Sequence, residues 1–162
     1  MINNSRDLNL LIPEVKKAFI NTQVEAKSYG ITIITTSTAR TVQCQVALHA
    51  QGRYNLTYVN ALRQGVGLPP ITEKENEKKI TWTLKSEHLV NFDDNDKTND
   101  LSKAVDFAII KNGKAIWVKA DVNKNNVNDY LEVGLIGESF GLEWGGRWEN
   151  QDFVHLQKKG SI

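Results

Sequence analysis

The stretch AVDFAIIKNGKAIWV, residues 104–118, decides the fold class of this 162-residue chain. Residues 104–110 alternate as the residues of a β-strand do. Asn112-Gly113 follows, a dipeptide that is a strong signal for a two-residue hairpin turn, and residues 114–118 supply the returning strand. The sequence therefore predicts an antiparallel β-hairpin in this stretch.

Further strands and helices are predicted on both sides of this hairpin. Strand-like segments are residues 31–36, which are β-branched throughout, 80–84 and 153–156. Helical spacing of apolar residues, with a glycine close beyond each end, occurs in residues 9–29, 41–51 and 130–140. Residues 54–79 contain several glycines and prolines and end in a charged run, which predicts an irregular segment. With no internal repeat or linker, we expect a single α+β domain over residues 1–162, a small antiparallel sheet flanked by helices.

Composition limits the classes of function. Twenty basic and nineteen acidic residues give a net charge of +1, so no broad basic surface indicates a nucleic-acid partner. The one cysteine, Cys44, excludes an intramolecular disulfide and a multi-thiolate metal site, and its helical context favours a buried apolar side chain. No basic start followed by an apolar run predicts a signal peptide, and no apolar run is long enough for stable membrane insertion.

Two of the three histidines lie where they could bind a metal ion. His88 follows a predicted strand, Asp106 lies in the hairpin, and His155 lies in the last predicted strand. Two imidazoles and one carboxylate from separate strands suit catalytic zinc and leave a fourth position for water. Such triplets are common by chance, so ordinary polar residues at strand ends are the commoner origin of this pattern. His49, in a predicted helix, is expected to be structural or exposed.

Short motifs occur in a fixed order along nearly the whole chain. They are Thr38-Ala39-Arg40-Thr41 with Gln45, Leu48 and Gln51-Gly52-Arg53; residues 67–72 with 81–83; Ser86-Glu87-His88; Ala104-Val105-Asp106; Asn112-Gly113-Lys114 with Trp117; and residues 141–148 with Asp152 and His155. In this order they resemble the motifs of the zinc D-Ala-D-Ala carboxypeptidase and L-alanyl-D-glutamate peptidase family. Residues 67–72 and 81–83 resemble the connector of its phage members. The resemblance implies the fold that these peptidases share with hedgehog proteins.

The resemblance also implies roles for the matched residues. The zinc ligands would be His88, Asp106 and His155. Asp152 would be the catalytic carboxylate, taking a proton from a water whose pKa zinc lowers to about 7 and passing it to the departing amine. Arg40 would face the scissile carbonyl and stabilise its developing negative charge. Substrate-binding side chains would be Ser86, Gln45 and Trp148.

Three departures from the family pattern concern the surroundings of this site. His88 and Asp106 lie eighteen positions apart, whereas relatives hold these ligands within one short turn, so residues 91–102 resemble an insertion. Arg147 stands where many relatives carry aspartate, and Val154 stands where proline is common before the histidine. We expect these changes to affect substrate fit without removing a ligand.

The function that the resemblance implies is a peptidoglycan peptidase of the phage endolysin branch, cutting the L-alanyl-D-glutamate bond of stem peptides. Alternatives are a D-Ala-D-Ala carboxypeptidase, or an inactive peptidoglycan-binding module of the same fold. Without a signal peptide, the protein would be made in the host cytoplasm and would need a holin to reach the wall or periplasm. We expect a monomer with no separate wall-binding domain.

A second metal ion is suggested by the oxygen-bearing residues near position 121. Asp121, Asn123, Asn125, Asp129 and Glu132 have the spacing of an EF-hand calcium loop. Asn126 replaces its usual glycine, and asparagine is the next best residue for a left-handed turn. A solvated, asparagine-rich surface turn is the commoner origin of such a pattern, so calcium is a hypothesis here.

The four tryptophans divide into two pairs by their context. Aromatic residues are more often in the core than in a binding site, so Trp82 and Trp117 are expected to be buried. Trp144 and Trp148 flank Gly145-Gly146 close to His155, and one of them is expected to border the cleft.

Overall fold

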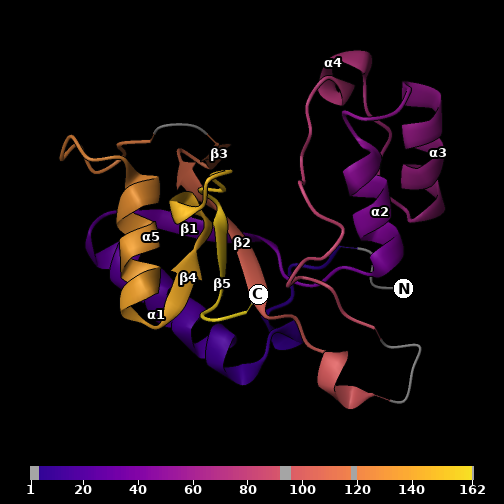
Figure 1. Cartoon of the computed structure of the whole chain (residues 1–162). Helices are drawn as coiled ribbons and strands as arrows, with labels where there is room; N and C mark the ends of the chain where they lie inside the picture. The colour runs from indigo at the N-terminus through magenta and orange to yellow at the C-terminus, as the bar shows by residue number, and fades with distance from the viewer. Residues whose placement is uncertain (1–3, 92–95, 118–119, 162) are drawn as a thin grey trace.

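The computed structural model describes residues 4–91, 96–117 and 120–161, and it confirms the α+β fold class (Figure 1). One antiparallel sheet has the strand order β1-β2-β5-β4, and β3 also pairs with β2. These strands are β1 (Thr32–Ser37), β2 (Ala104–Lys111), β3 (Lys114–Ile116), β4 (Leu142–Trp144) and β5 (His155–Lys158). The long strand β2 is central, because it pairs with β1 along one edge and with β5 and then β3 along the other.

The predicted hairpin is confirmed. Asn112 and Gly113 have φ angles of 51° and 75°, the two positive values that a type I′ turn requires. Lys111 pairs with Lys114 and Ile109 with Ile116 across the turn. The returning strand ends at Ile116 in the structure, and residues 118 and 119 lie outside the described residues.

Two helices, α1 (Pro13–Ser28) and α5 (Asp129–Ser139), pack on each other and on the sheet. The buried face of α1 joins one core cluster with side chains of β1, β2, β5 and α5, among them Phe19, Phe107, Tyr130 and Leu156. Gly134 in α5 is required for this packing, since a Cβ there would collide with the ring of Trp144 on β4. The helix predicted over residues 9–29 begins later, at Pro13, and a short 3-10 turn, η1 (Leu8–Leu10), precedes it.

A second group of helices stands apart from the sheet (Figure 1). It contains α2 (Val42–Ala50), α3 (Leu56–Gly65) and the short α4 (Glu73–Asn76). The prediction of an irregular segment over residues 54–79 is therefore wrong. The Asn55 side chain caps α3 by accepting the Tyr58 N–H at 2.9 Å, and Val59 and Arg63 are buried one turn apart. The glycines and prolines end this helix instead of preventing it.

The strand predicted at residues 80–84 is also wrong. This segment is extended, but it pairs with no strand in the described part of the chain, and side chains of the helical lobe hold its carbonyl groups. Gln45 Nε2 donates to the Thr83 carbonyl at 2.7 Å, and Arg53 donates to the Thr81 carbonyl at 3.1 Å. The segment thereby connects the helical lobe to the sheet.

The tryptophan predictions are partly wrong. Trp82 and Trp117 are 60% and 59% exposed, so neither lies in the core. Cys44 is fully buried, as its helical context predicted. Among the described residues, no helix is both long and apolar enough to cross a membrane.

Candidate metal centre and active site

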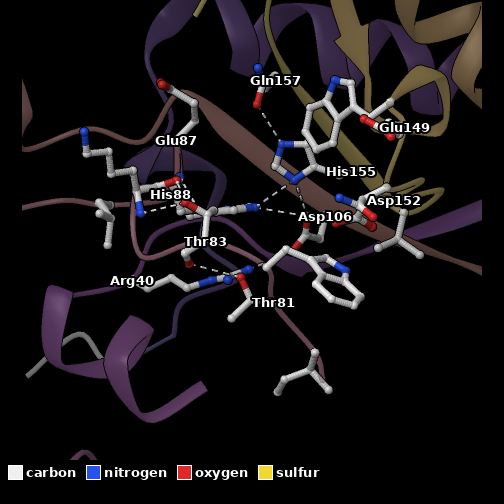
Figure 2. A pocket seen from close by; sticks show the side chains of 18 residues that line it. Arg40, Thr81, Thr83, Glu87, His88, Asp106, Glu149, Asp152, His155 and Gln157 are labelled. Atoms are coloured by element: carbon white, nitrogen blue, oxygen red, sulfur yellow. Dashed lines mark hydrogen bonds and ion pairs between the residues drawn. The ribbon is translucent and has the colours of Figure 1, made fainter. Parts of the chain in front are cut away.

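Three side chains from distant parts of the sequence converge at one end of the sheet (Figure 2). Asp106 on β2 lies directly opposite His155 on β5 in the strand register, and the His88 loop is held beside them by the Arg40 N–H, which donates to the His88 carbonyl. Asp106 Oδ1 lies 3.0 Å from His88 Nε2 and 2.9 Å from His155 Nδ1, and these two nitrogens are 3.3 Å apart. Within the described residues this is the one set of three histidine, cysteine or acidic side chains whose ligand atoms all lie within 4.8 Å of one another.

The outer hydrogen bonds of the two histidines fix which nitrogen faces the centre. His88 Nδ1 lies 2.7 Å from the Thr38 carbonyl, which can only accept, so Nδ1 carries the proton and Nε2 presents a lone pair. His155 Nε2 lies 3.0 Å from Gln157 Oε1, while Gln157 Nε2 donates to the Ser161 carbonyl. Both imidazoles and the carboxylate therefore direct lone pairs at one point, which is the arrangement that a bound cation requires.

The pKa values of the three groups follow from burial and mutual charge. Burial lowers the pKa of His88 to about 4, despite the opposing charge of Asp106. Burial also opposes charge on His155, but its hydrogen bond to Asp106 and the charges of Asp106 and Asp152 outweigh that effect and raise its pKa. Burial alone would raise the pKa of Asp106, yet the two histidines hold it well below its usual value. A metal ion bound at this point would supply positive charge to the same cluster and would compete with a proton on His155. The two nitrogens and one oxygen fit zinc best, because this metal prefers such donors at tetrahedral sites.

Arg40 connects this centre to the helical lobe. Its guanidinium donates to Asp106 Oδ2 at 2.8 Å, to Gln45 Oε1 at 3.1 Å and to Ser37 Oγ. Arg40 also lines the cleft, as its predicted role requires. Gln45 lies behind the cleft wall and is fully buried, and its amide nitrogen donates to Thr81 and Thr83. Gln45 thus braces the cleft wall, and a direct contact of Gln45 with substrate stays a prediction.

The centre lies at the bottom of a cleft of about 810 Å³ between the sheet and the 80–86 segment. Ser86, Trp148 and Asp152 line this cleft together with His88 and His155. Trp148 packs against His155 with ring centroids 5.0 Å apart, which confirms that one tryptophan of the pair borders the cleft. Burial and the charge of Asp106 raise the pKa of Asp152. The cleft therefore holds a basic carboxylate beside the cluster.

The insertion between His88 and Asp106 does not separate the ligands, because its base is closed. The Asn91 N–H donates to the Asn99 carbonyl at 3.1 Å, and the Lys103 N–H donates to the Glu87 carbonyl at 2.9 Å. Residues 97–99 form a 3-10 turn, and residues 92–95 lie outside the described residues.

The other departures from the family pattern have different surroundings. Arg147 makes a two-pronged ion pair with Glu138 on α5, with Nε–Oε1 and Nη2–Oε2 distances of 2.8 Å. Val154 lines the cleft. Of the two, only Val154 is thus placed to contact a substrate.

Comparison with known proteins assigns the chain to a family. Residues 101–158 match the family model described as D-alanyl-D-alanine carboxypeptidase. The peptidoglycan L-alanyl-D-glutamate endopeptidase CwlK of Bacillus subtilis (strain 168) is 30% identical over 150 residues, which cover 91% of this chain and 72% of CwlK. The chain belongs to this D-alanyl-D-alanine carboxypeptidase family of peptidases. The residues matched by the family model include Asp106, Asp152 and His155, whereas Arg40 and His88 precede them.

The fold of this peptidase agrees with that of a solved structure. The L-Ala D-Glu endopeptidase ChiX of Serratia marcescens superposes with a TM-score of 0.51 at 15% identity, over 93% of this chain and 82% of ChiX. At this identity the likeness concerns the fold alone.

Sequence reasoning missed two residues that orient the ligand histidines. Thr38 contributes only its carbonyl group, which no side-chain pattern reveals. Gln157 is 5% exposed and could have been found, because it follows His155 by two residues on the same strand and therefore lies on the same face of the sheet.

The residues predicted to bind calcium lie together in a different place. Asp121, Asn123, Asn125, Asp129 and Glu132 belong to the loop that leads into α5 and to the first turn of that helix. None of them lines the cleft. Asn126 has a φ angle of 66°, so its predicted left-handed conformation is confirmed.

Proposed function

We propose that this peptidase is a zinc-dependent peptidoglycan hydrolase that cleaves the L-alanyl-D-glutamate bond of stem peptides. The observation that carries the proposal is the convergence of three lone pairs, from His88, Asp106 and His155, at the bottom of an open cleft that also holds Asp152. The named activity of CwlK supports the choice of bond. His88, Asp106 and His155 would hold the zinc ion.

The chemistry divides between the ion and the side chains around it. Bound zinc would lower the pKa of a water molecule and polarise the scissile carbonyl. Asp152 would accept a proton from the attacking water and deliver it to the departing amine, and its raised pKa suits this exchange near neutral pH. Arg40, fixed by Asp106 and Gln45, would face the carbonyl oxygen with a permanent positive charge.

The substrate would occupy the cleft between the sheet and the 80–86 segment. Ser86 and Trp148 both line this cleft, which supports their predicted contacts with the stem peptide. Exposed Trp82 on the same segment adds apolar surface for the rest of the substrate. A polymer with exposed peptide branches suits such an open site.

We also propose the biological setting that the phage-like connector in residues 67–72 and 81–83 suggests. The protein would act as an endolysin, as a monomer whose residues 1–162 form one catalytic domain. It would reach the wall or periplasm from the host cytoplasm after a holin opens the membrane.

A D,D-carboxypeptidase that removes terminal D-Ala is the second candidate, favoured by the description of the matching family model. Mass spectrometry of purified peptidoglycan digested by the zinc-loaded protein separates the two. Release of stems that begin at D-glutamate, suppressed by a chelator and restored by zinc, is the expected result. Loss of terminal D-Ala alone would assign the carboxypeptidase activity. An unchanged polymer would contradict both and favour a binding module.

A further inference from the structure

A second set of oxygen donors surrounds the loop between β3 and α5, which lies beyond α5 from the α2–α3 lobe (Figure 1). Counted from Asp121, side-chain oxygens occupy the first, third, fifth, ninth and twelfth positions of an EF-hand loop. The helix that follows begins at Asp129, the ninth position, as it does after an EF-hand loop. Asn126 supplies the left-handed sixth position that the template usually fills with glycine.

The side chains of this loop converge from its two ends. Both carboxylate oxygens of Asp121 accept backbone N–H groups, from Asn125 at 3.0 Å and Asn126 at 3.2 Å. The two oxygens of Glu132 accept from the amide groups of Asn125 at 2.7 Å and Asn123 at 3.3 Å. Asp121 and Glu132 are thereby held on either side of the same two asparagines.

Asp129 provides the observation that points to a cation. Its side chain is fully buried, and Oδ2 accepts the Val122 N–H at 2.7 Å. Its other oxygen, Oδ1, is buried without a hydrogen-bond partner among the described residues. A buried, unpartnered carboxylate oxygen is costly for a folded protein, and a metal ion is one of the few groups that removes that cost.

The charges around Asp129 lead to the same conclusion. Two further carboxylates, those of Asp121 and Glu132, belong to the same loop and to the first turn of α5. None of these three carboxylates makes an ion pair within the described part of the chain. The loop and the start of α5 thus carry three acidic side chains without an ion pair.

We propose that residues 121–132 form a calcium site, distinct from the zinc centre, with side-chain ligands from Asp121, Asn123, Asn125, Asp129 and Glu132. The Val127 carbonyl would take the seventh position, which the template fills from the backbone. An all-oxygen donor set with a flexible loop suits calcium better than zinc, which prefers nitrogen and sulfur, or magnesium, which keeps several waters.

The place of the site in the fold indicates what the ion does. Asn123 Nδ2 also donates to the Tyr29 carbonyl at the end of α1, and Asp129 and Glu132 lie in the first turn of α5. Calcium would therefore connect the two helices that cover the sheet. Its role is to stabilise the fold on which β4 and β5 rest, apart from the cleavage step.

Calorimetric titration of calcium into the zinc-loaded protein, dialysed free of calcium, tests the site. We expect one bound calcium per chain and a melting temperature raised by roughly 5–10 °C at a hundredfold excess over the Kd. Glu132→Gln should weaken binding at least about tenfold, because the bidentate carboxylate is lost. Glu77→Gln, the same charge change at an exposed position directly after α4, is the matched control and should bind as the wild type does.

Asp129→Asn gives a sharper signature, since it keeps an oxygen for the Val122 N–H and removes the buried charge. Without calcium, this variant should melt at the same temperature as the wild type or at a higher one. With calcium, it should melt at a lower temperature than the calcium-bound wild type. A purely structural role for Asp129 would lower the melting temperature equally in both conditions and overturn the proposal. Absence of calcium heat, equal heat from magnesium, or unchanged binding by Glu132→Gln would overturn it as well.

Discussion

The two clusters of polar side chains in this protein are assembled in opposite ways. The cluster of His88, Asp106 and His155 draws one residue from each of three distant segments, and it exists only because β2 and β5 pair in one register. The loop at residues 121–132 brings its donors together within one short stretch of chain. The first cluster therefore depends on the whole fold, whereas the second depends on a turn and the start of one helix.

The surroundings of the two clusters differ accordingly. Each ligand of the first cluster has an outer partner that fixes its orientation: Thr38 for His88, Gln157 for His155 and Arg40 for Asp106. In the loop, the donors bond mainly to each other. A rigid, oriented centre beside a cleft suits catalysis, and a local, self-contained loop suits stabilisation.

The strongest test of this contrast is removal of one ligand from each cluster. His88→Ala should abolish stoichiometric zinc binding and lower cleavage by at least about 10³-fold, because metal activation of water is worth several kcal/mol. Glu132→Gln should leave zinc content and cleavage near the wild-type level. For both variants, mass spectrometry measures the zinc content, digestion of peptidoglycan measures the cleavage, and circular dichroism checks that the protein is folded. A folded His88→Ala protein that retains one zinc per chain would contradict the ligand assignment.

The next largest expected effect distinguishes zinc binding from proton transfer by Asp152. Asp152→Asn should keep zinc and fold but lose cleavage by about 10²–10⁴-fold, the usual range for a positioned acid–base group. Asp152 lies in the cleft but outside the three-ligand cluster, so its loss should not change the zinc affinity. Initial rates on peptidoglycan and a zinc titration check the two halves of this expectation. Wild-type rates for the variant would exclude the proposed mechanism.

The fold could be predicted from the sequence where the signal is local. Asn112-Gly113 specifies its own turn, and the helix at residues 129–139 and the first strand are displaced by only one residue from their predicted ranges. Prediction failed where the deciding partner is far away. Alternation at residues 80–84 does not reveal that Gln45 and Arg53, not a strand, take up the backbone carbonyls. Trp82 is exposed because it lies on that segment, facing the cleft.

The two polar clusters also have some features that the sequence predicts and others that it does not. The EF-hand spacing of the loop can be counted directly along the chain, but the buried state of Asp129 cannot. For the proposed zinc centre, the residue types alone favoured ordinary strand-end histidines. Resemblance to known peptidases indicated the ligands, and the structure shows them in contact although His88 and Asp106 are eighteen positions apart and His155 lies a further 49 positions along the chain. The supporting partner Gln157 was overlooked, although its position two residues after His155 made it accessible to prediction.

Gln157 supplies a prediction of intermediate size. Gln157→Leu should weaken zinc binding by about 10–100-fold, the usual cost of removing an outer hydrogen bond from a metal-bound histidine. Gln157→Glu keeps an acceptor oxygen for His155 Nε2 and should preserve the affinity. Competition with a chromophoric zinc chelator measures both values. Equal zinc affinities of the Leu variant and the wild type would mean that the partner does not orient the ligand.

The smallest expected effect concerns the ion pair between Arg147 and Glu138, which joins the segment before His155 to α5. Because Arg147 is exposed, Arg147→Ala should lower the melting temperature by only about 1–3 °C at neutral pH, and Arg147→Lys should lower it less. Hydrogen bonds from Arg147 lower the pKa of Glu138. The stabilisation is therefore present above the ordinary glutamate pKa and is lost as the pH falls through the lower folded value. In thermal melts at successively lower pH, the differences among the three proteins should shrink as Glu138 becomes protonated. A gap that stays constant from neutral pH until the wild type itself unfolds in acid would show that Arg147 stabilises by packing on α5 and not by charge.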